Sequence, residues 1–365
     1  FTATALSAAF TCIVMGLVAN YPIASAPTLG LNAFFTYTVC LGMHVKWQTA
    51  LAAVFVASIL FILLTVFKVR EMIIDAIPSD IKYAISAGIG LFIAFIGLQG
   101  GKLISKSDST LVTVGALNNP LVWITIFGLV VTIFLMIARV PGAIFIGMIV
   151  AAVFGIAIGQ IPMPKAFISG VPSLSPIFGQ AVFHISDINT VQMWIVVFTF
   201  LLVTFFDTTG TLIGLVQQAG LMKDNKMPRA GEALAADSSG MLVGSVLGTS
   251  PVGAFVESSA GIAVGGRTGL TVFTTQVTAP ALIIVGVLMA ENLAHVHWTD
   301  LEIAIPCFLI ALGMPLTYSI SDGLGWGLII YPVSMLAAKR FKEITPMMWI
   351  LFFVFVIYFV VLNVK

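Results

Sequence analysis

Charged residues are scarce in this 365-residue chain, where Asp, Glu, Lys and Arg together fill only 8% of the positions. A soluble domain carries roughly 25% charged residues, so the composition excludes an ordinary water-soluble protein. Hydrophobic residues make up 59% of the chain, and its mean hydropathy is +1.12. The net charge of +1 gives no reason to expect a nucleic-acid partner. We therefore predict a polytopic protein that is solvated mainly by the lipid bilayer.

Cysteine and recognisable catalytic motifs are also rare. Cys12, Cys40 and Cys307 lie in apolar segments and lack the spacing of a metal site, so we interpret them as small packing residues. The sequence has no Walker-type phosphate loop, and no Ser–His–Asp or Cys–His grouping can be argued from it. It therefore indicates neither an enzyme nor a protein that binds ATP, and we expect no cofactor.

Long apolar runs are what the chain does have. A spanning helix needs about 20 mainly apolar residues, and thirteen runs come near that length. They are Thr2–Asn20, Pro27–Leu41, Trp47–Phe67, Ile81–Leu98, Pro120–Ile137, Gly142–Ile158, Met193–Leu215, Ala233–Leu247, Ser250–Val264, Phe273–Met289, Leu301–Leu316, Gly323–Ala337 and Met347–Leu362. A polar, proline-rich loop is predicted over Gln160–Asn189.

Two of these runs are too polar and too rich in glycine and proline to be ordinary helices. They are Pro27–Leu41 and Ser250–Val264, and their irregular parts belong to the stretches Tyr21–Phe35 and Thr249–Thr271. The second stretch contains Glu257 and Arg267. Irregular backbone at membrane depth is tolerated only inside protein or beside a wet cavity. A pair of such interrupted segments in the two halves of a chain is typical of a transporter's binding site. We therefore predict that Ala26–Asn32 and Ser250–Glu257 lie side by side near the bilayer midplane.

The basic residues conflict with a simple count of crossings. They form three clusters, at Lys68/Arg70, Lys223/Lys226/Arg229 and Lys339/Arg340/Lys342, which the positive-inside rule places in the cytoplasm. Four predicted segments separate the first two clusters, but five separate the last two. All three share one side only if one crossing is absent after Arg229. Phe1 opens directly onto an apolar run, which predicts that a preceding helix is also absent.

Four motifs resemble those of the AzgA-like hypoxanthine/guanine permeases, a branch of the nucleobase–cation symporter (nucleobase–ascorbate transporter) superfamily. They are NYPIASAPTLGLNAFF (Asn20–Phe35), FFDTTGTLIG (Phe205–Gly214), GTSPVGAFVESSAGIAVGGRTGLT (Gly248–Thr271) and MPLTYSISDG (Met314–Gly323). The resemblance implies an all-α membrane fold of two inverted seven-helix repeats, with two broken helices that carry short strands around a nucleobase. Relative to that pattern, this chain lacks the first helix and one helix after residue 271.

The same resemblance implies a single permease domain with a mobile core and a gate. We expect the core at about 1–67 and 191–271, the gate at about 72–160 and 273–337, and a C-terminal apolar helix at 347–362. The implied function is uptake of guanine, hypoxanthine or adenine across the cell membrane with protons, by an elevator-like movement of the core. The sequence leaves open whether the protein forms a homodimer.

Glu257 is the leading candidate for a substrate ligand, because intramembrane acids are usually functional and a carboxylate accepts two parallel donors such as those of guanine. The alternative is a structural ion pair with Arg267. The family also has its substrate-binding glutamate at this motif position. Phe255 could stack on a purine ring, and Ala254 belongs to the same expected site.

Asp207 stands in an otherwise uncharged segment and is followed by threonines, so it is a candidate for substrate contact or for proton coupling. The alternative is an acid that only pins its helix to its neighbours. Many relatives have another acid one turn earlier, where this chain has Thr204. Asp237 is a second candidate for proton coupling, with a structural role equally open.

Asn32 and Gly30 follow Pro27 at the expected start of a half-helix, where free backbone N–H groups suit a polar ligand. By motif match Asn32 is a substrate-site residue, and the alternative is a turn or capping residue. His295 and His297, with the acids Glu291 and Asp300 nearby, could hold a metal ion, but their polar loop favours an ordinary surface role.

Competing functions remain for such a chain. An anion carrier of the sulfate or bicarbonate type would have the same kind of broken helices, whose paired N-termini attract anions. An acid such as Glu257 argues against an anion site and favours a neutral base rich in hydrogen-bond donors. A passive channel is the other alternative.

Overall fold

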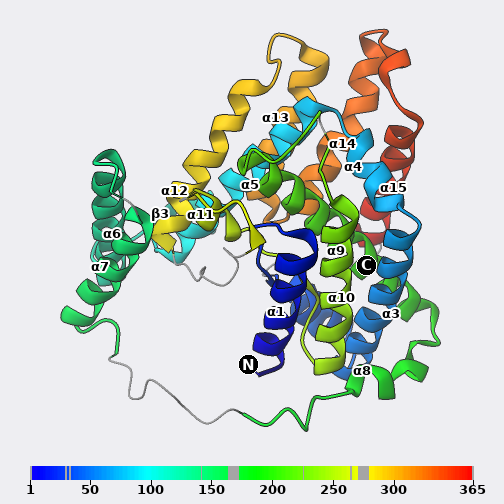
Figure 1. Cartoon of the computed structure of the whole chain (residues 1–365), viewed down its shortest axis with the longest axis horizontal. Coiled ribbons are helices and arrows are strands. Elements are labelled where there is room, and N and C mark those ends of the chain that lie inside the picture. Colours follow the sequence, from blue (N-terminus) through cyan, green and yellow to red (C-terminus); the bar gives the residue numbers. More distant parts are fainter. Residues whose placement is uncertain are drawn as a thin grey trace.

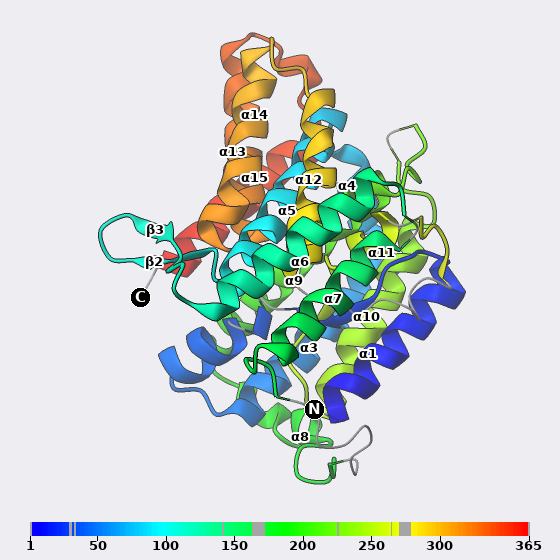
Figure 2. The ribbon, with the colours of Figure 1, turned by 90° about the vertical axis from the view of Figure 1, so that its left-hand side faces the viewer.

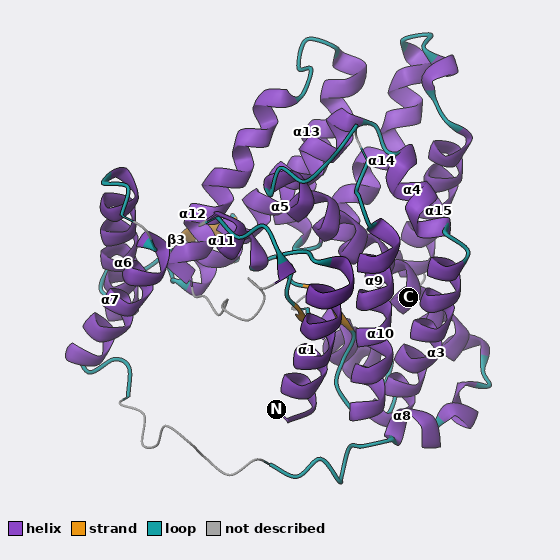
Figure 3. Cartoon of the chain, viewed as in Figure 1, coloured by secondary structure: helices purple, strands orange, loops and turns teal. Residues whose placement is uncertain are grey.

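Helices dominate the computed structural model of this chain, and strands are few (Figure 1; Figure 3). The residues that the structure describes are 2–28, 31–32, 34–140, 142–162, 172–224, 226–263, 265–269 and 279–363. Every structural statement below refers to these ranges.

The elements follow one another in two halves. The first half contains α1 (Thr2–Val14), the π-helix η1 (Met15–Ala19), β1 (Ser25–Pro27), the π-helix η2 (Phe34–Gly42), α3 (Trp47–Val66), α4 (Val69–Ala76), α5 (Ser79–Gly100), β2 (Ile104–Ser107), β3 (Leu111–Val114), α6 (Pro120–Ile137) and α7 (Ala143–Ala157). The second half contains α8 (Gln180–Phe183), η3 (Ile185–Ile188), α9 (Val191–Gln218), α10 (Ala230–Leu247), β4 (Val252–Ala254), α11 (Ser258–Ala263), α12 (Ala279–Ala290), η5 (Glu291–His295), α13 (Leu301–Thr317), α14 (Ile320–Ala337), η6 (Phe341–Glu343) and α15 (Pro346–Asn363).

Six helices of the described chain are long and apolar enough to cross a membrane: Thr2–Ala19, Trp47–Val66, Ser79–Gly100, Pro120–Ile137, Val191–Gln218 and Ile320–Ala337. Shorter apolar helices add Ile146–Ala157, Leu282–His295, Leu301–Thr317 and Pro346–Val360. The prediction of an all-α, multi-pass membrane protein is confirmed. Several elements were not expected from the sequence, among them α4, the β2–β3 hairpin, and the short helices α8 and η3 in the predicted loop.

Polar residues define where several of these helices begin and end. The Thr190 hydroxyl accepts a hydrogen bond from Met193 N at 3.2 Å at the start of α9. The Ser319 hydroxyl does the same for Asp322 N at the start of α14, also at 3.2 Å. These bonds satisfy backbone donors that a helix end leaves free. Helix α10 ends at Gly248, whose φ of 92° is a conformation that favours glycine.

The helices form two packed groups and one separate pair (Figure 1; Figure 2). Helices α1, α3, α9 and α10 surround the strands β1 and β4, whereas α5, α12, α13 and α14 pack against one another. Helix α9 also contacts α5 and α14 and so joins the two groups. Helices α6 and α7 pack together and touch α12, and Figure 1 shows them at the left, apart from the other helices.

Small residues allow α5 and α12 to approach closely. A Cβ added to Gly286 would lie 2.5 Å from Ala94 Cβ, and one added to Gly90 would lie 2.5 Å from Met289 Cβ. Glycine at such a contact lets two helix backbones approach, which is a common way to pack helices in lipid.

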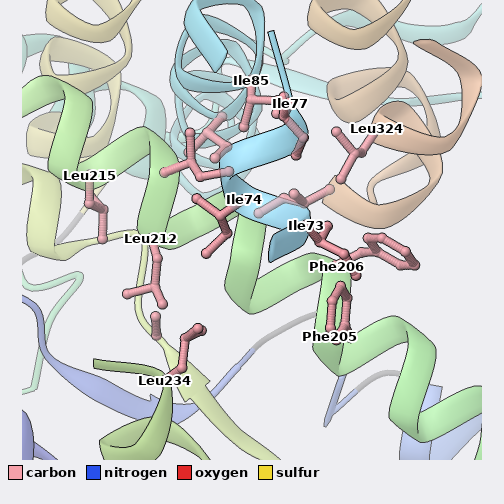
Figure 4. Packing of buried hydrophobic residues seen from close by; sticks show 14 of the residues in the cluster. Ile73, Ile74, Ile77, Ile85, Phe205, Phe206, Leu212, Leu215, Leu234 and Leu324 are labelled. Carbon is pink, nitrogen blue, oxygen red and sulfur yellow. The ribbon is translucent and has the colours of Figure 1, made fainter. Parts of the chain in front are cut away.

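The apolar core lies where the two groups meet. Figure 4 shows residues of α4, α5, α9, α10 and α14 in one buried cluster. Ile73 and Ile74 of α4 and Ile77, which follows this helix, belong to the cluster, and Figure 4 shows Ile73 next to Phe206 of α9. Helix α4 is therefore a buried connector between α3 and α5.

Contacts place the three basic clusters near one end of the molecule. Lys226 interacts electrostatically with Lys82 near the start of α5, and Lys68 precedes α4, which leads to α5. Helix η5, directly before α13, also contacts α5, and Arg340 forms a 2.8 Å ion pair with Glu302 in the first turn of α13.

Candidate functional site

The two interrupted stretches meet as a two-stranded antiparallel sheet. Strand β1 pairs with β4 so that Ser25, Ala26 and Pro27 lie opposite Ala254, Gly253 and Val252, respectively. The pairing extends further, because Phe255 N donates to Ala24 O at 2.8 Å. The prediction that these distant stretches lie side by side is confirmed.

Each strand has only three residues, and neither could satisfy its own backbone. In lipid every backbone N–H and C=O must find a partner inside the protein, and here each stretch supplies the partners of the other. Ala24 N adds a bond to the Ser258 hydroxyl at 2.9 Å. The glycine and proline residues that break the helices thus produce a paired, irregular platform with buried residues on both sides.

Asn32 stands just after β1, and its side chain joins the two stretches. The Ser250 hydroxyl donates to Asn32 Oδ1, and Asn32 Nδ2 lies 3.5 Å from Pro27 O. This amide therefore has a structural contact at the predicted site, while its half-buried side chain keeps donor capacity. Gly30, the other candidate of this stretch, lies outside the described residues.

Glu257 directly precedes α11 and is half-buried. Its Oε2 is buried, with no hydrogen-bond partner in the described part of the chain. Arg267 is exposed and donates to the carbonyls of Ile262 and Gly266, each at 2.7 Å. The structure therefore does not contain the Glu257–Arg267 ion pair that was the alternative, and it leaves the acid with an unused acceptor.

Asp207 lies in the middle of α9, half-buried, and interacts electrostatically with both Asp237 and Glu257. The threonines around it do not use their hydroxyls within the described structure. The buried hydroxyls without a hydrogen-bond partner there are those of Thr204, Thr208, Thr209 and Thr211. Unpaired buried hydroxyls are uncommon in proteins, and their concentration on this part of α9 marks a polar interior next to the strands.

Gly253 brings β4 against these acids. A Cβ at this position would lie 3.1 Å from Thr208 Oγ1, 3.2 Å from Thr28 Cγ2 and 3.9 Å from Asp237 Oδ1. Only a residue without a side chain lets the strand approach α9 and α10 this closely. Ala254, the next residue, is only 2% exposed, and Phe255 is half-buried.

Arg70 is the residue at this site that the sequence interpretation missed. It was counted in a cytoplasmic cluster with Lys68, but it is completely buried and forms an ion pair with Asp237, with 3.6 Å between Nη2 and Oδ2. The cluster at 68–70 therefore contributes only Lys68 to the surface. One signal could have revealed this, since Arg70, Ile73, Ile74 and Ile77 have the spacing of a buried helix face.

The histidine loop is organised without a metal site. No group of three His, Cys, Asp or Glu side chains in the described ranges could hold a metal ion. His297 is bound instead to Asp80 at the start of α5, with Nδ1 and the backbone N at 2.7 and 3.0 Å from Asp80 Oδ1. The Asp80 carboxylate raises the pKa of this exposed histidine above its ordinary value. His295 lies against the ring of Tyr83.

With this geometry in place, relatives identify the family. The model of a permease family, Xan_ur_permease, matches residues 1–278. The chain belongs to this permease family. It is 51% identical to the guanine/hypoxanthine permease PbuG of Bacillus subtilis (strain 168), over 100% of this chain and 87% of that protein. It is 36% identical to the adenine permease AdeP of Escherichia coli (strain K12), over 100% of this chain and 85% of that protein.

Among solved structures, the chain is similar to the transmembrane domain of the cyanobacterial bicarbonate transporter BicA, with a TM-score of 0.44 and 13% identity over 92% of each chain. The sequence alignment to PbuG spans 382 positions, whereas this permease has 365 residues, so at least 17 aligned positions have no residue here.

Proposed function

We propose that this permease takes up purine nucleobases, such as guanine, hypoxanthine or adenine, across the cell membrane by proton symport. The observation that carries the proposal is the β1–β4 pair inside a membrane permease, which joins the stretch of Asn32 to the stretch of Glu257, an acid whose buried Oε2 has no hydrogen-bond partner in the described chain. The relatives named above are guanine/hypoxanthine and adenine permeases, which supports the same class of substrate.

The chemistry of the two stretches fits a flat molecule that is rich in hydrogen-bond groups. Guanine has N1–H and an exocyclic amine side by side, and the free carboxylate of Glu257 can accept both. The Asn32 amide can donate and accept on another edge of the base. Phe255 is the aromatic residue nearest to Glu257 along the chain, and it is our candidate for stacking on the purine ring.

Coupling to protons is supported by the surplus of acids. Asp207, Asp237 and Glu257 interact within the membrane part of the protein, and Arg70 is the basic residue paired with one of them in the described structure. A carboxylate without a cation partner is expensive to keep charged in a buried place, so it is suited to take up and release a proton. We assign this role to Asp207.

The packing of the helices supports a core that moves against a gate. We propose that residues 1–67 and 191–271 form the core, that residues 72–160 and 273–337 form the gate, and that 347–362 is a peripheral helix. In this arrangement the strand pair belongs wholly to the core. A nucleobase held there would be carried across the membrane as the core slides along α5 and its neighbours.

Uptake assays with proteoliposomes test the proposal. Radiolabelled hypoxanthine, guanine, adenine, uracil and sulfate are offered in parallel, with an inward proton gradient. We expect saturable accumulation of one or more purines, and a loss of accumulation when an ionophore removes the gradient. Sulfate uptake without purine uptake would establish an anion carrier instead. Counterflow of labelled purine distinguishes a carrier from a channel, because a channel shows none.

A further inference from the structure

Arg70 of α4 is buried against side chains of α3 and α10. Its guanidinium donates to Ser238 Oγ at 3.1 Å and to Leu234 O at 3.3 Å, both on α10, in addition to the ion pair with Asp237. Its central carbon lies 3.9 Å from the centroid of the Phe61 ring of α3. A fully buried arginine is rare, and contacts on this scale indicate that the charge has a function there.

Asp237 stands between this arginine and the strand pair. Its Oδ2 faces Arg70, while its Oδ1 is 3.9 Å from the position of a Cβ on Gly253. Both carboxylate oxygens are buried. Besides the ion pair with Arg70, the carboxylate interacts with the Thr208 side chain and the Ala254 backbone, so Asp237 links helix α4 to α9 and β4.

The acids around the site outnumber Arg70, which is paired with one of them in the described structure. Asp207 of α9 interacts with Asp237 of α10 and with Glu257 before α11. Tyr358 of α15 also interacts with Asp207, and its hydroxyl donates to Asp322 of α14 at 2.8 Å. An arginine stays protonated in proteins, and an opposite charge this close favours the ionised form of a carboxylate. Of the three acids, Asp237 is thus the one with a fixed counter-charge.

We propose that Arg70 is a positioning residue of the transport site, which holds Asp237 charged and fixed behind β4 and leaves the exchangeable proton to Asp207 and Glu257. The proposal rests on the proposed function for its role in transport. It assigns to Asp237 a structural task in place of proton coupling. It also explains why a connector as short as α4 is anchored so firmly to α10.

Labelling of the wild-type protein tests the charge assignment directly. Dicyclohexylcarbodiimide modifies protonated carboxyl groups in apolar surroundings, and peptide mass spectrometry locates the product. We expect modification of Asp207 or Glu257 and none of Asp237. In the Arg70→Gln variant, Asp237 loses its partner and should become modified, because an unpaired buried carboxylate takes up a proton. Modification of Asp237 in the wild type would overturn the proposal.

Transport by paired variants tests the positioning role. Arg70→Gln alone leaves a buried acid without its cation, and we expect purine binding to weaken about tenfold or more. The double variant Arg70→Gln/Asp237→Asn removes both charges and should regain much of that binding, with the wild-type ratio of protons to base. Arg70→Lys, which keeps the charge, should lie between the two.

Loss of proton coupling in a folded double variant would show that Asp237 carries the proton and would contradict the proposal. Equal binding defects in the double variant and in Arg70→Gln would contradict it as well. If the double variant does not fold, the labelling of the wild type decides. Since labelling needs no purine, a wild type that binds no purine refutes the proposed function without affecting the labelling result.

Discussion

Two arginines of this permease hold carboxylates in opposite surroundings. Arg70 is completely buried and lies 3.6 Å from Asp237, which is buried as well. Arg340 is 33% exposed and lies 2.8 and 2.7 Å from Glu302 and Glu343. The surface arginine therefore has more carboxylate partners than the buried one, and they lie closer to it.

Distance alone gives the wrong order of importance for these pairs. Water competes for the surface charges and screens them, so an exposed ion pair contributes about 0–1 kcal/mol to stability. Removing one partner of a buried pair leaves a charge that nothing solvates, which costs about 3–5 kcal/mol. We expect the longer, buried pair to contribute more to stability than the exposed pairs. Three substitutions and one measurement of stability against pH test this contrast.

The largest effect is expected from Arg70→Gln. It leaves Asp237 buried without a counter-charge, so the free energy of unfolding should fall by about 3–5 kcal/mol. Thermal unfolding of the purified protein in detergent measures the loss. Lys68→Gln is the matched control, because Lys68 is exposed and only two residues away. Equal melting temperatures for the two variants would show that the buried ion pair contributes no more to stability than an exposed lysine does.

Glu257→Gln should separate binding from stability. This acid has a buried oxygen without a hydrogen-bond partner in the described chain, and it forms no ion pair there. We expect a nearly unchanged melting temperature and a loss of about 1.5–3 kcal/mol in purine binding, or roughly ten- to a hundredfold.

Calorimetry with guanine and hypoxanthine measures the binding constant of this variant. The control is Arg267→Gln, whose side chain donates to two backbone carbonyls in the described chain. Purine binding at the wild-type level by Glu257→Gln would remove this residue from the site.

Arg340→Gln should have a small effect on stability. The change removes ion pairs at the start of α13 and after α14, and we expect a small loss of stability that shrinks further in high salt. Lys342→Gln serves as the control on the same surface. A loss as large as that of Arg70→Gln would contradict the contrast between buried and exposed pairs.

The smallest effect is expected at the pair of the exposed His297 and the buried Asp80. Because Asp80 raises the pKa of His297 above 6.5, the folded protein prefers the protonated ring. The stabilisation is present below about pH 6.5 and disappears as the pH rises through the folded-state pKa. Melting temperatures of the wild type and His297→Gln should therefore differ slightly in acid and converge in base. His295→Gln, as a control, should show no such convergence.

The sequence predicts the parts of this protein that depend on run length and on rare residues. Apolar runs locate the membrane helices, and the proline and glycine residues of 21–35 and 249–271 indicate the two broken ones. Glu257 and Asp207 are evident because acids are rare in such runs. In the structure Glu257 follows β4 closely along the chain. Asp207 interacts electrostatically with Glu257 and with Asp237.

Other features depend on contacts between distant residues and could not be predicted. A strand of three residues is too short to show an alternating pattern, so the register of β1 and β4 is visible only in the structure. The partner of Arg70 is 167 positions away, on α10. The basic side chain was therefore assigned to the surface with Lys68, although the isoleucines that follow it have helical spacing.

Proton-coupled transport is the central claim, and Asp207→Asn in proteoliposomes tests it most directly. Two quantities are measured on the same vesicles: exchange of labelled purine across the membrane, and accumulation driven by a proton gradient. Exchange needs no net proton movement, so we expect the variant to exchange purine and to accumulate none above equilibrium. Accumulation by Asp207→Asn at the wild-type level would contradict the assignment of the coupled proton to Asp207.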